Sequence, residues 1–413
     1  MSQVMNQPSE QMNPKMRALA KAKPRAKSKR RLSDIVKPAR LHRDIYLDEN
    51  LFQEEMATLF ERNWIYVGHE SEIARPGDFK TIVLGRVPAI IARGSADGVI
   101  RGFFNSCRHR GATVCEEEYG SRSRFMCPYH GWTYHNDGRL AGVPFREGYG
   151  PSLDGEDLGL LPLAALESFH GFMFARVFDQ GGPSLVDHLA GAGEILAGFG
   201  PSSAKPISVL TPPQRFRHHA NWKLSAENIT DGYHASFTHA GFVQAKKTVE
   251  GLDVPLRGDW KLTGLGNGHG IIDFGSGNEH NRDNAINMLV FPNMLFLGVS
   301  VRIIRPISVD TTQTSFFPTV VAGAAEHETV ARLRGHTDLY GPMGMVSADD
   351  ASMFERIQRG LQKSANEWVL LVRGTAEDHR DAEGRPIGMD ATDELGQREF
   401  YRQYSARMSS VRF

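Results

Sequence analysis

The sequence predicts an α+β protein with two domains: an all-β domain over residues 41–170 and a domain with a sheet and flanking helices over residues 171–413. Three observations lead to this prediction. The chain has 413 residues, enough for two or three domains. Its first half consists of short apolar runs separated by Gly and Asp-Gly turns. Its second half mixes strand-like and helix-like segments that do not alternate one by one, which is typical of an α+β domain.

The composition is that of a globular protein with a large core. Hydrophobic residues make up 40% of the chain and charged residues 23%, and the formal net charge is zero. The sequence contains no run of about 18 apolar residues, so we expect no membrane span. Its three cysteines cannot form a disulfide framework. Free thiols favour a reducing compartment, and we therefore expect a cytoplasmic protein.

Residues 1–40 differ from the rest of the chain because they are basic, poor in acidic residues and nearly free of aromatics. Such a composition predicts a solvated, disordered arm. Two alternatives stay open: a patch that attracts nucleic acid or another acidic partner, and a transit peptide, which is also rich in arginine. The arm lacks the apolar segment of a secretory signal.

Apolar residues at helical spacing begin at Leu51 and continue to Phe60, after a plausible N-cap at Asp48. Strands are expected within residues 79–107 and 131–145. In the second half, the same patterns predict helices at about 183–200, 223–239, 328–341, 347–363 and 393–408, and strands at 288–308 and 314–323.

Two half-motifs in the first domain each carry one thiol and one imidazole. Cys107 and His109 form the first half, and Cys127 and His130 form the second, with seventeen residues between the halves. A structural zinc also accepts two cysteines and two histidines. Zinc fingers, however, usually place cysteine with cysteine and histidine with histidine along the chain. The mixed halves favour a [2Fe–2S] centre in which two histidines replace two cysteines on one iron.

In the second domain, the stretch ENITDGYHASFTH places His234 and His239 close to Asp231. Residues five apart on a regular helix point about 140° away from each other. Both histidines can therefore share a metal only if the helix bends or ends. We expect such an irregularity between them, where Ala235 and Ser236 leave room.

Iron(II) sites that activate oxygen combine two histidines with one carboxylate and leave the other coordination positions open. Asp349 and Asp350, at the start of an expected helix, are candidates for the carboxylate. A pair of aspartates at a helix start can also cap the helix. One of the two could cap while the other binds the metal.

Both motifs resemble those of one family. CRHRGATVC…CPYHGWTY resembles the Rieske motif of non-haem iron aromatic ring-hydroxylating oxygenases, and NWKLSAENITDGYHASFTH resembles the mononuclear iron motif of their large (α) subunits. The resemblance covers about residues 45–413, and ENITDGYH and NEWVLLVRGT are similar to the benzoate, anthranilate and salicylate oxygenases. It implies a bacterial enzyme with an all-β Rieske domain and a helix-grip, START-like catalytic domain.

The resemblance assigns a role to each candidate residue. It implies the [2Fe–2S] ligands Cys107, His109, Cys127 and His130 and the mononuclear Fe(II) ligands His234, His239 and Asp350. The position of Gln358 selects Asp350 over Asp349. Asp231 would link a Rieske histidine of one subunit to an iron-ligand histidine of the next, and Asn228 would lie near the iron. We take Asp231 and Asn228 as the catalytic candidates beside the metal ligands.

The same resemblance places residues in the substrate pocket: Asn228, Ala235, Phe237 and Tyr340. For the apolar ones, a plain core position is the alternative. A substrate that carries a carboxylate would need a basic partner. Arg302 and Arg305, on an expected strand, are candidates, and a surface or salt-bridged arginine is the alternative for each.

The implied function is that of the terminal oxygenase component of an aromatic ring-hydroxylating dioxygenase. It would insert O2 into a single-ring aromatic substrate that bears an acid or an amine. Electrons would come from NADH or NADPH through a ferredoxin, a flavin reductase or both. The resemblance implies a homotrimer or an α3β3 assembly with a small subunit, and neither a membrane nor nucleic acid is expected as a partner.

Three alternatives stay open. A Rieske monooxygenase or demethylase that acts on a non-aromatic amine or a methyl ether would share both iron sites. A zinc-stabilised protein whose basic arm binds nucleic acid would explain the first motif but not His234, His239 and Asp350. A pure electron carrier would leave the second domain unexplained.

Overall fold

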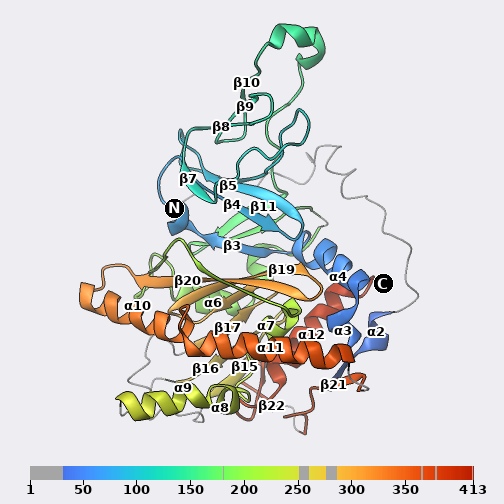
Figure 1. The fold of residues 1–413 in the computed structure, drawn as a ribbon, viewed down its shortest axis with the longest axis vertical. Coiled ribbons are helices and arrows are strands. Elements are labelled where there is room, and N and C mark those ends of the chain that lie inside the picture. Colours follow the sequence, from blue (N-terminus) through green and yellow to red (C-terminus); the bar gives the residue numbers. More distant parts are fainter. Residues whose placement is uncertain are drawn as a thin grey trace. The chain divides into compact units, whose positions relative to one another are not determined.

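The computed structural model describes residues 31–179, 181–250, 260–275, 286–363, 366–376, 379–411 and 413. The chain forms two compact units (Figure 1): unit 1 is Phe60–Gly182, and unit 2 combines the described residues before Phe60 with Pro183–Phe413. Residues 1–30 of the predicted arm lie outside the described residues. Residues 31–40, which were also expected in the arm, belong to unit 2, where Leu32 and Ile35 are buried.

Unit 1 consists of short strands, as its turn-rich sequence predicts. The strands are β3 Ile65–His69, β4 Asp78–Leu84, β5 Val87–Arg93, β6 Ile100–Phe104, β7 Tyr119–Ser121, β8 Arg124–Met126, β9 Thr133–His135, β10 Leu140–Gly142, β11 Ala165–Phe169 and β12 Phe172–Arg176. They pair antiparallel in three sheets with the orders β11-β12-β3, β6-β5-β4-β7 and β10-β9-β8. Two 3-10 segments, Glu70–Ile73 and Arg146–Leu153, complete the unit.

The core of unit 1 contains the cysteine side chains. Phe79, Ile90 and Phe125 are at most 1% exposed and pack in one cluster with Cys107 and Cys127. The rings of Phe79 and Phe125 meet edge to face, with centroids 5.1 Å apart. The thiols are therefore held by a packed β core and not by free loops.

Unit 2 is organised around one large antiparallel sheet. Its strands are β13 Ile207–Val209, β14 Gln214–His218, β15 Lys261–Gly266, β16 His269–Asp273, β17 Ile286–Val290, β18 Met294–Phe296, β19 Ser300–Ser308, β20 Thr311–Val321, β22 His379–Arg380 and β23 Pro386–Ile387. Their order is β13-β20-β19-β18-β17-β16-β15-β23-β22, and β14 also pairs with β20. A separate small sheet joins β1 Val36–Lys37, β2 Arg40–His42 and β21 Trp368–Leu370.

Helices flank this sheet, which confirms the predicted architecture (Figure 1). They are α2 Leu32–Ile35, α3 Asp44–Leu47, α4 Glu49–Glu55, α5 Leu185–Leu189, α6 Gly191–Ala197, α7 Trp222–Asn228, α8 Ala235–Thr238, α9 Ala240–Ala245, α10 Glu326–Tyr340, α11 Met345–Lys363 and α12 Leu395–Met408, with π-helical turns at Met56–Phe60 and Lys246–Glu250. α12 packs on β15 and β16, α7 on β19, and α10 on β20. The helix expected at 183–200 is divided at Ala190, whose φ of +44° is incompatible with a continuous helix.

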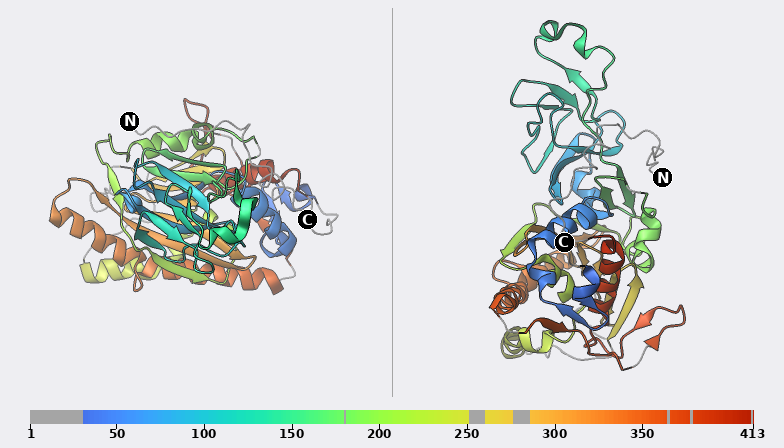
Figure 2. Two further views of the ribbon diagram at one scale, coloured as in Figure 1. Left: turned by 90° about the horizontal axis from the view of Figure 1, so that it is seen from above. Right: turned by 90° about the vertical axis from the view of Figure 1, so that its right-hand side faces the viewer.

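The described residues before Phe60 are part of unit 2, and they lie beside α12 (Figure 2). The sequence analysis placed most of them with the β domain, and the structure differs for a physical reason. The Glu55 carboxylate accepts hydrogen bonds from Lys223 Nζ at 2.6 Å, Trp222 Nε1 at 2.8 Å and Tyr404 Oη at 2.5 Å. These contacts bury the acid completely, and they join the two ends of unit 2 around α7.

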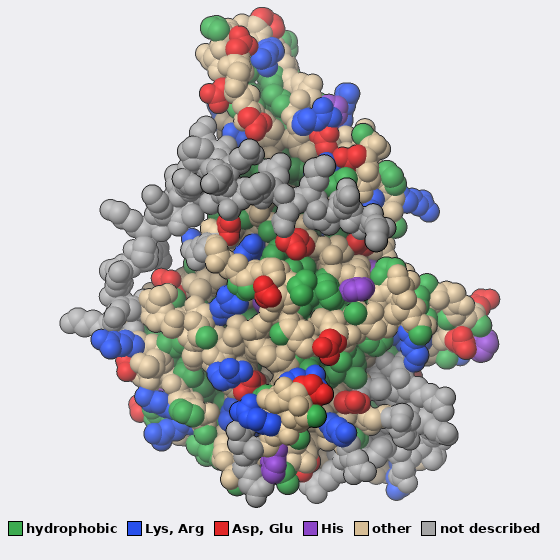
Figure 3. Space-filling model, turned by 180° about the vertical axis from the view of Figure 1, so that it is seen from behind, with side chains coloured by type: hydrophobic (Ala, Val, Ile, Leu, Met, Phe, Trp, Pro, Cys, Tyr) green, Lys and Arg blue, Asp and Glu red, His purple; other side chains and the backbone are tan. Residues whose placement is uncertain are grey.

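None of the described helices is long and apolar enough to cross a membrane. On the face of the molecule drawn in Figure 3, acidic and basic side chains are interspersed over the described surface.

Candidate active site

Two loops of unit 1 share one backbone design. Each begins at a cysteine, Cys107 or Cys127, whose N–H donates to the carbonyl five residues later at 2.8 Å. In each loop the glycine four residues after the cysteine, Gly111 or Gly131, donates its N–H to the cysteine carbonyl. The φ values of these glycines are +78° and +70°, which glycine adopts without strain. The repeated design presents one thiol and one imidazole from each of two equivalent turns.

The imidazoles of the two loops lie together. The ring centroids of His109 and His130 are 4.7 Å apart, and Trp132 stacks on His109 with an interplanar angle of 4°. The Nδ1 atom of His109 is buried and has no hydrogen-bond partner. Buried polar atoms are nearly always satisfied, so this nitrogen is available as a metal ligand.

Tyr134 supports the first cysteine. Its hydroxyl oxygen accepts a hydrogen bond from the Arg108 N–H at 3.0 Å and lies 3.2 Å from Cys107 Sγ. The hydroxyl hydrogen is therefore free to point at the sulfur. Burial raises the pKa of Cys107, and the contact with Tyr134 lowers it, so the hydroxyl favours the thiolate form that binds metal.

The spacing of these four side chains suits two metal ions better than one. A tetrahedral zinc would hold its ligand atoms within about 4 Å of one another. Within the described ranges, the only group of three or more candidate ligand atoms that all lie within 4.8 Å of one another is in unit 2. The cysteines and histidines of unit 1 thus fit a cluster of two irons. Cys115 is different: burial raises its pKa to about 11, and its thiol contacts Glu117, so it is an inert structural thiol.

In unit 2, the chain leaves its helical path twice, in the turn before His234 and again at His239. The helix expected at 223–239 ends at Asn228, and α8 is a single turn between His234 and His239. His239 has φ −100° and ψ 19°, outside helical values, before α9 begins. An irregularity was expected between the histidines, near Ala235. The structure places the irregularities in the turn before His234 and at His239, and α8 between them stays regular.

These breaks bring His234, His239 and Asp350 together. One ligand atom from each residue lies within 4.8 Å of the others. The Nε2 atoms of His234 and His239 are 3.5 Å and 3.3 Å from the same oxygen, Asp350 Oδ1. Asp350 comes from α11, and its side chain is 10% exposed. Two imidazoles and one carboxylate from distant parts of the sequence therefore converge on one point.

The protonation of this group is set by its charges. Burial alone would lower the pKa of His234, but its contacts with Asp231 and Asp350 outweigh burial and raise it to about 10. Burial alone would raise the pKa of Asp350, but the two histidines lower it well below its usual value. The site thus stabilises a carboxylate surrounded by positive charge, which is the environment that a divalent cation provides.

Outer carboxylates face the second nitrogen of each imidazole. Asp231 Oδ2 lies 3.6 Å from the imidazole Nδ1 of His234. Asp231 Oδ1 also accepts a hydrogen bond from the backbone N–H of His234 at 3.2 Å. Asp349 Oδ2 lies 3.5 Å from His239 Nδ1. Such carboxylates fix the orientation of metal-binding imidazoles. The sequence analysis offered Asp349 as a helix cap or a metal ligand and did not predict its contact with the Nδ1 atom of His239. The position of Asp349 next to Asp350 was the only sequence signal for this contact.

A small cavity is lined in part by Asp350 and encloses about 30 Å³, room for one water. Among the predicted pocket residues, Asn228 lines it and donates from Nδ2 to Asp350 Oδ1 at 3.3 Å. Tyr340 is buried and stacks on Arg302, which also lines the cavity. Ala235, Phe237 and Tyr340 do not line it, and the Phe237 side chain is 68% exposed because α8 turns it outward.

Glu227, next to Asn228, sits in a hydrogen-bonded cluster that sequence reasoning did not find. Its carboxylate accepts a hydrogen bond from Tyr46 Oη at 3.1 Å and another from Tyr401 Oη. Burial raises the pKa of Glu227 to about 7, against the opposing effect of both tyrosines. The tyrosines come from α3 and α12, so no local pattern reveals the cluster.

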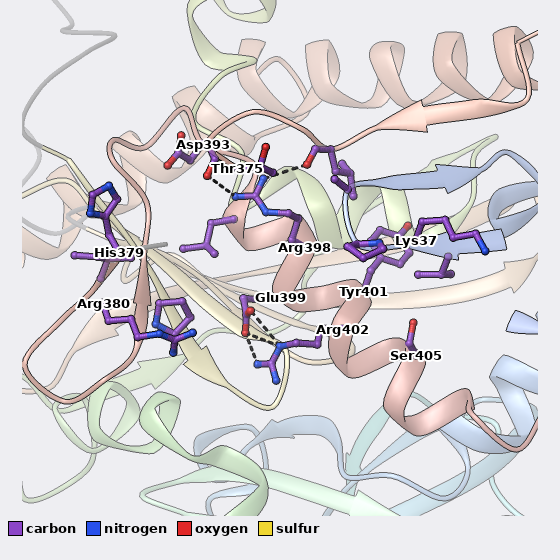
Figure 4. A pocket seen from close by; sticks show the side chains of 18 residues that line it. Lys37, Thr375, His379, Arg380, Asp393, Arg398, Glu399, Tyr401, Arg402 and Ser405 are labelled. Carbon is purple, nitrogen blue, oxygen red and sulfur yellow. Dashed lines mark hydrogen bonds and ion pairs between the residues drawn. The ribbon is translucent and has the colours of Figure 1, made fainter. Parts of the chain in front are cut away.

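A larger cavity of about 600 Å³ lies elsewhere in unit 2, between the N-terminal segment and α12 (Figure 4). Its arginines already have partners: Arg402 pairs with Glu399, and Arg398 donates to the carbonyls of Leu371 and Arg373. It contains none of the residues of the candidate metal site, and we assign the chemistry to the smaller cavity.

Comparisons with known proteins agree with this arrangement. Residues 63–161 match the Rieske [2Fe-2S] domain, and residues 210–410 match the ring hydroxylating alpha subunit (catalytic domain). The chain is 33% identical over 410 residues to the large oxygenase component of a naphthalene 1,2-dioxygenase system from Pseudomonas aeruginosa. The alignment covers 89% of this chain and 91% of the relative.

A second relative is the large subunit of a 2-halobenzoate 1,2-dioxygenase from Burkholderia cepacia, 31% identical over 380 residues, with 81% of this chain and 80% of the relative covered. Among solved structures, naphthalene 1,2-dioxygenase with indole bound in the active site is similar with a TM-score of 0.81. The identity is 30%, and the match covers 92% of this chain and 94% of that one.

Both family matches follow the order of the two units, and the relatives are aligned over most of their length. The chain therefore belongs to the family of Rieske ring-hydroxylating oxygenase α subunits: it is the terminal oxygenase of an aromatic ring-hydroxylating dioxygenase, works with a reductase or ferredoxin, and uses a [2Fe–2S] cluster and a mononuclear iron.

Proposed function

We propose that His234, His239 and Asp350 hold the mononuclear iron of this oxygenase. The observation that carries the proposal is the convergence of both Nε2 atoms on Asp350 Oδ1. Two imidazoles and one carboxylate form the ligand set of iron(II) sites that activate oxygen, and they leave coordination positions open. When bound, the iron supplies the activation of dioxygen.

The second part of the proposal assigns the [2Fe–2S] cluster to the two equivalent loops of unit 1. The ligands would be Cys107, His109, Cys127 and His130. The orphaned Nδ1 of His109 and the hydroxyl of Tyr134 at Cys107 Sγ support this assignment. When bound, the cluster supplies single electrons.

The surrounding residues orient this machinery. Asp231 and Asp349 would hold the imidazole rings by their Nδ1 atoms, and Asn228 would hold the Asp350 carboxylate. The Asp231 side chain is 30% exposed, so a group from another subunit could reach it. This supports the predicted bridge between the histidines of neighbouring subunits in a homotrimer or an α3β3 assembly.

For the substrate, we keep the prediction of a single aromatic ring that bears an acid or an amine. One relative is named for naphthalene and another for 2-halobenzoate, so the family includes fused rings and single-ring acids. A ring can enter the small cavity only if side chains of its wall move. A single ring requires less displacement than a fused pair.

Metal analysis with EPR tests the proposed ligands. We expect about three irons per chain, two in the cluster and one mononuclear. Asp350→Ala should lose the mononuclear iron and keep the EPR signal of the reduced cluster, whereas Cys107→Ser should lose the cluster. Cys115→Ser is the matched control and should keep both. An iron-free, zinc-containing wild type, or a Cys107→Ser variant with an intact cluster, would overturn the assignment.

Isotope incorporation tests the reaction. With ¹⁸O2, a dioxygenase places two labelled oxygens in one product molecule. A single labelled oxygen, or loss of a methyl group, would instead indicate a monooxygenase or demethylase. A cytoplasmic location stays a prediction from the free thiols.

A further inference from the structure

Arg302 is a buried cation beside the proposed iron site. It lies on β19, its side chain lines the same cavity as Asn228 and Asp350, and it is 5% exposed. Arginine is rarely buried to this extent without a partner of opposite charge. Its neighbours therefore decide whether it is a structural residue or a binding residue.

The charge of Arg302 is not neutralised by the part of the chain that the structure describes. Its guanidinium lies over the rings of Phe316 and Tyr340, 4.5 Å and 4.1 Å from their centroids, and contacts the Tyr340 hydroxyl. Its Nε is buried without a hydrogen-bond partner. Asp350 acts on it electrostatically, but the two do not form an ion pair.

Arg332 shows how this fold satisfies a buried arginine that has only a structural role. Its guanidinium donates to the carbonyls of Thr319 and Gly298 and to Thr319 Oγ1, at 2.7–2.8 Å. Arg302 has no such set of oxygen acceptors among the described residues. The aromatic rings offset part of the cost of burial, and the rest calls for an anion.

Arg305 was the other candidate on this strand. It lies three residues away, does not line the cavity, and faces Arg215 and Arg217. Burial lowers the pKa of Arg305, and repulsion from these neighbours lowers it further. Arg305 is therefore separated from the proposed iron site and serves as a matched control.

We propose that Arg302 binds the carboxylate of an aromatic acid substrate and so selects acids over uncharged aromatic compounds, such as amides and arylamines. The inference rests on the proposed function, because it places the acid next to the iron ligands. A planar guanidinium matches a carboxylate in a bidentate pair. Phe216, Phe316 and Phe354 supply apolar wall for the ring.

The local charge favours the same choice. A divalent iron keeps one positive charge after Asp350 neutralises the other, and Arg302 adds a second. An anionic substrate would reduce this excess, whereas an arylamine, which is uncharged near neutral pH, would not. The earlier alternatives of an acid or an amine are thereby reduced to the acid.

Equilibrium binding tests the proposal without turnover. The iron-loaded protein is titrated calorimetrically, without reductant, with benzoate, salicylate and anthranilate and with the neutral amide of each. We expect the wild type to prefer at least one acid over its amide by roughly 10-fold or more, the range of charge-assisted hydrogen bonds. Arg302→Gln should weaken the binding of that acid by roughly 10- to 100-fold and leave the affinity for the amide nearly unchanged.

Two variants separate the charge from other effects. Arg302→Lys keeps the positive charge without the planar guanidinium, and it should restore part of the preference for the acid over its amide. Arg305→Gln should bind the acids as the wild type does. If every amide binds as well as its acid in the wild type, or if Arg302→Gln binds acids normally, the inference is wrong. Iron content and the cluster EPR signal are measured in the same samples, so a failure of the proposed function is seen separately as missing metal.

Discussion

The buried pair of Glu55 and Lys223 yields a quantitative prediction about stability. Both side chains are at most 1% exposed, and the carboxylate also accepts from Trp222 and Tyr404. Glu55→Gln keeps the shape and can still accept hydrogen bonds, but it leaves a buried ammonium without its counter-charge. Removing one partner of such a pair costs about 3–5 kcal/mol. This is a large part of the roughly 5–15 kcal/mol that holds a typical domain folded.

The assay is urea unfolding followed by near-UV circular dichroism and tryptophan fluorescence. The double variant Glu55→Gln/Lys223→Met removes both charges, and we expect it to recover more than half of the lost stability. Glu383→Gln is the control in the same unit, because Glu383 is 63% exposed in its pair with Arg385 and should change stability by less than about 0.5 kcal/mol. A loss below about 1 kcal/mol for Glu55→Gln, or no recovery in the double variant, would refute the reasoning.

Three further predictions follow from the site. Burial raises the pKa of Glu227 to about 7, so its contribution to the free energy of unfolding is complete below about pH 4.5 and is lost as the pH rises through 7. In urea unfolding, the free energy of unfolding of Glu227→Gln should therefore rise relative to that of the wild type by up to about 3 kcal/mol between pH 5 and pH 8.5. Asp349→Asn should weaken iron binding by roughly 10- to 100-fold in a chelator competition while the cluster stays intact, because His239 loses its outer carboxylate. Tyr134→Phe removes a hydrogen bond to Cys107 Sγ and should lower the reduction potential of the cluster in a redox titration followed by EPR.

Each of these predictions can fail in a specific way. A stability difference between Glu227→Gln and the wild type that does not change with pH would mean that Glu227 does not titrate in this range. Wild-type iron affinity in Asp349→Asn would remove the outer carboxylate from the site. An unchanged potential in Tyr134→Phe would mean that the hydroxyl does not donate to the sulfur.

Local sequence pointed to most of the candidate metal residues. The chemistry of two histidines and a carboxylate pointed to His234, His239 and one of the adjacent aspartates, and the family resemblance then selected Asp350. The mixed thiol–imidazole halves pointed to the site in unit 1. The helix rule also predicted that the path between the histidines had to break. It did not predict the position of the break, because α8 forms one regular turn and the chain deviates before His234 and at His239.

What the sequence could not reveal depends on contacts between distant residues. Glu55 was assigned to the β domain because it lies in a helix just before the strands, yet its partners lie 168 and 349 residues away. Tyr46 and Tyr401 reach Glu227 from opposite ends of unit 2. Arg302 was one of two equivalent arginines until β19 placed it in the cavity and Arg305 outside it. No local sequence pattern predicts any of these contacts.

The order of the chain in unit 2 has a consequence for biosynthesis. Unit 1 is inserted between the first and the remaining segments of unit 2. Glu55 leaves the ribosome 349 residues before Tyr404, a delay of roughly 17–70 s at 5–20 residues per second. During that time unit 1 has all of its sequence and can fold, while the acid at Glu55 has to stay hydrated until α7 and then α12 arrive. The catalytic unit is therefore completed only when α12 packs against the segment that carries Glu55.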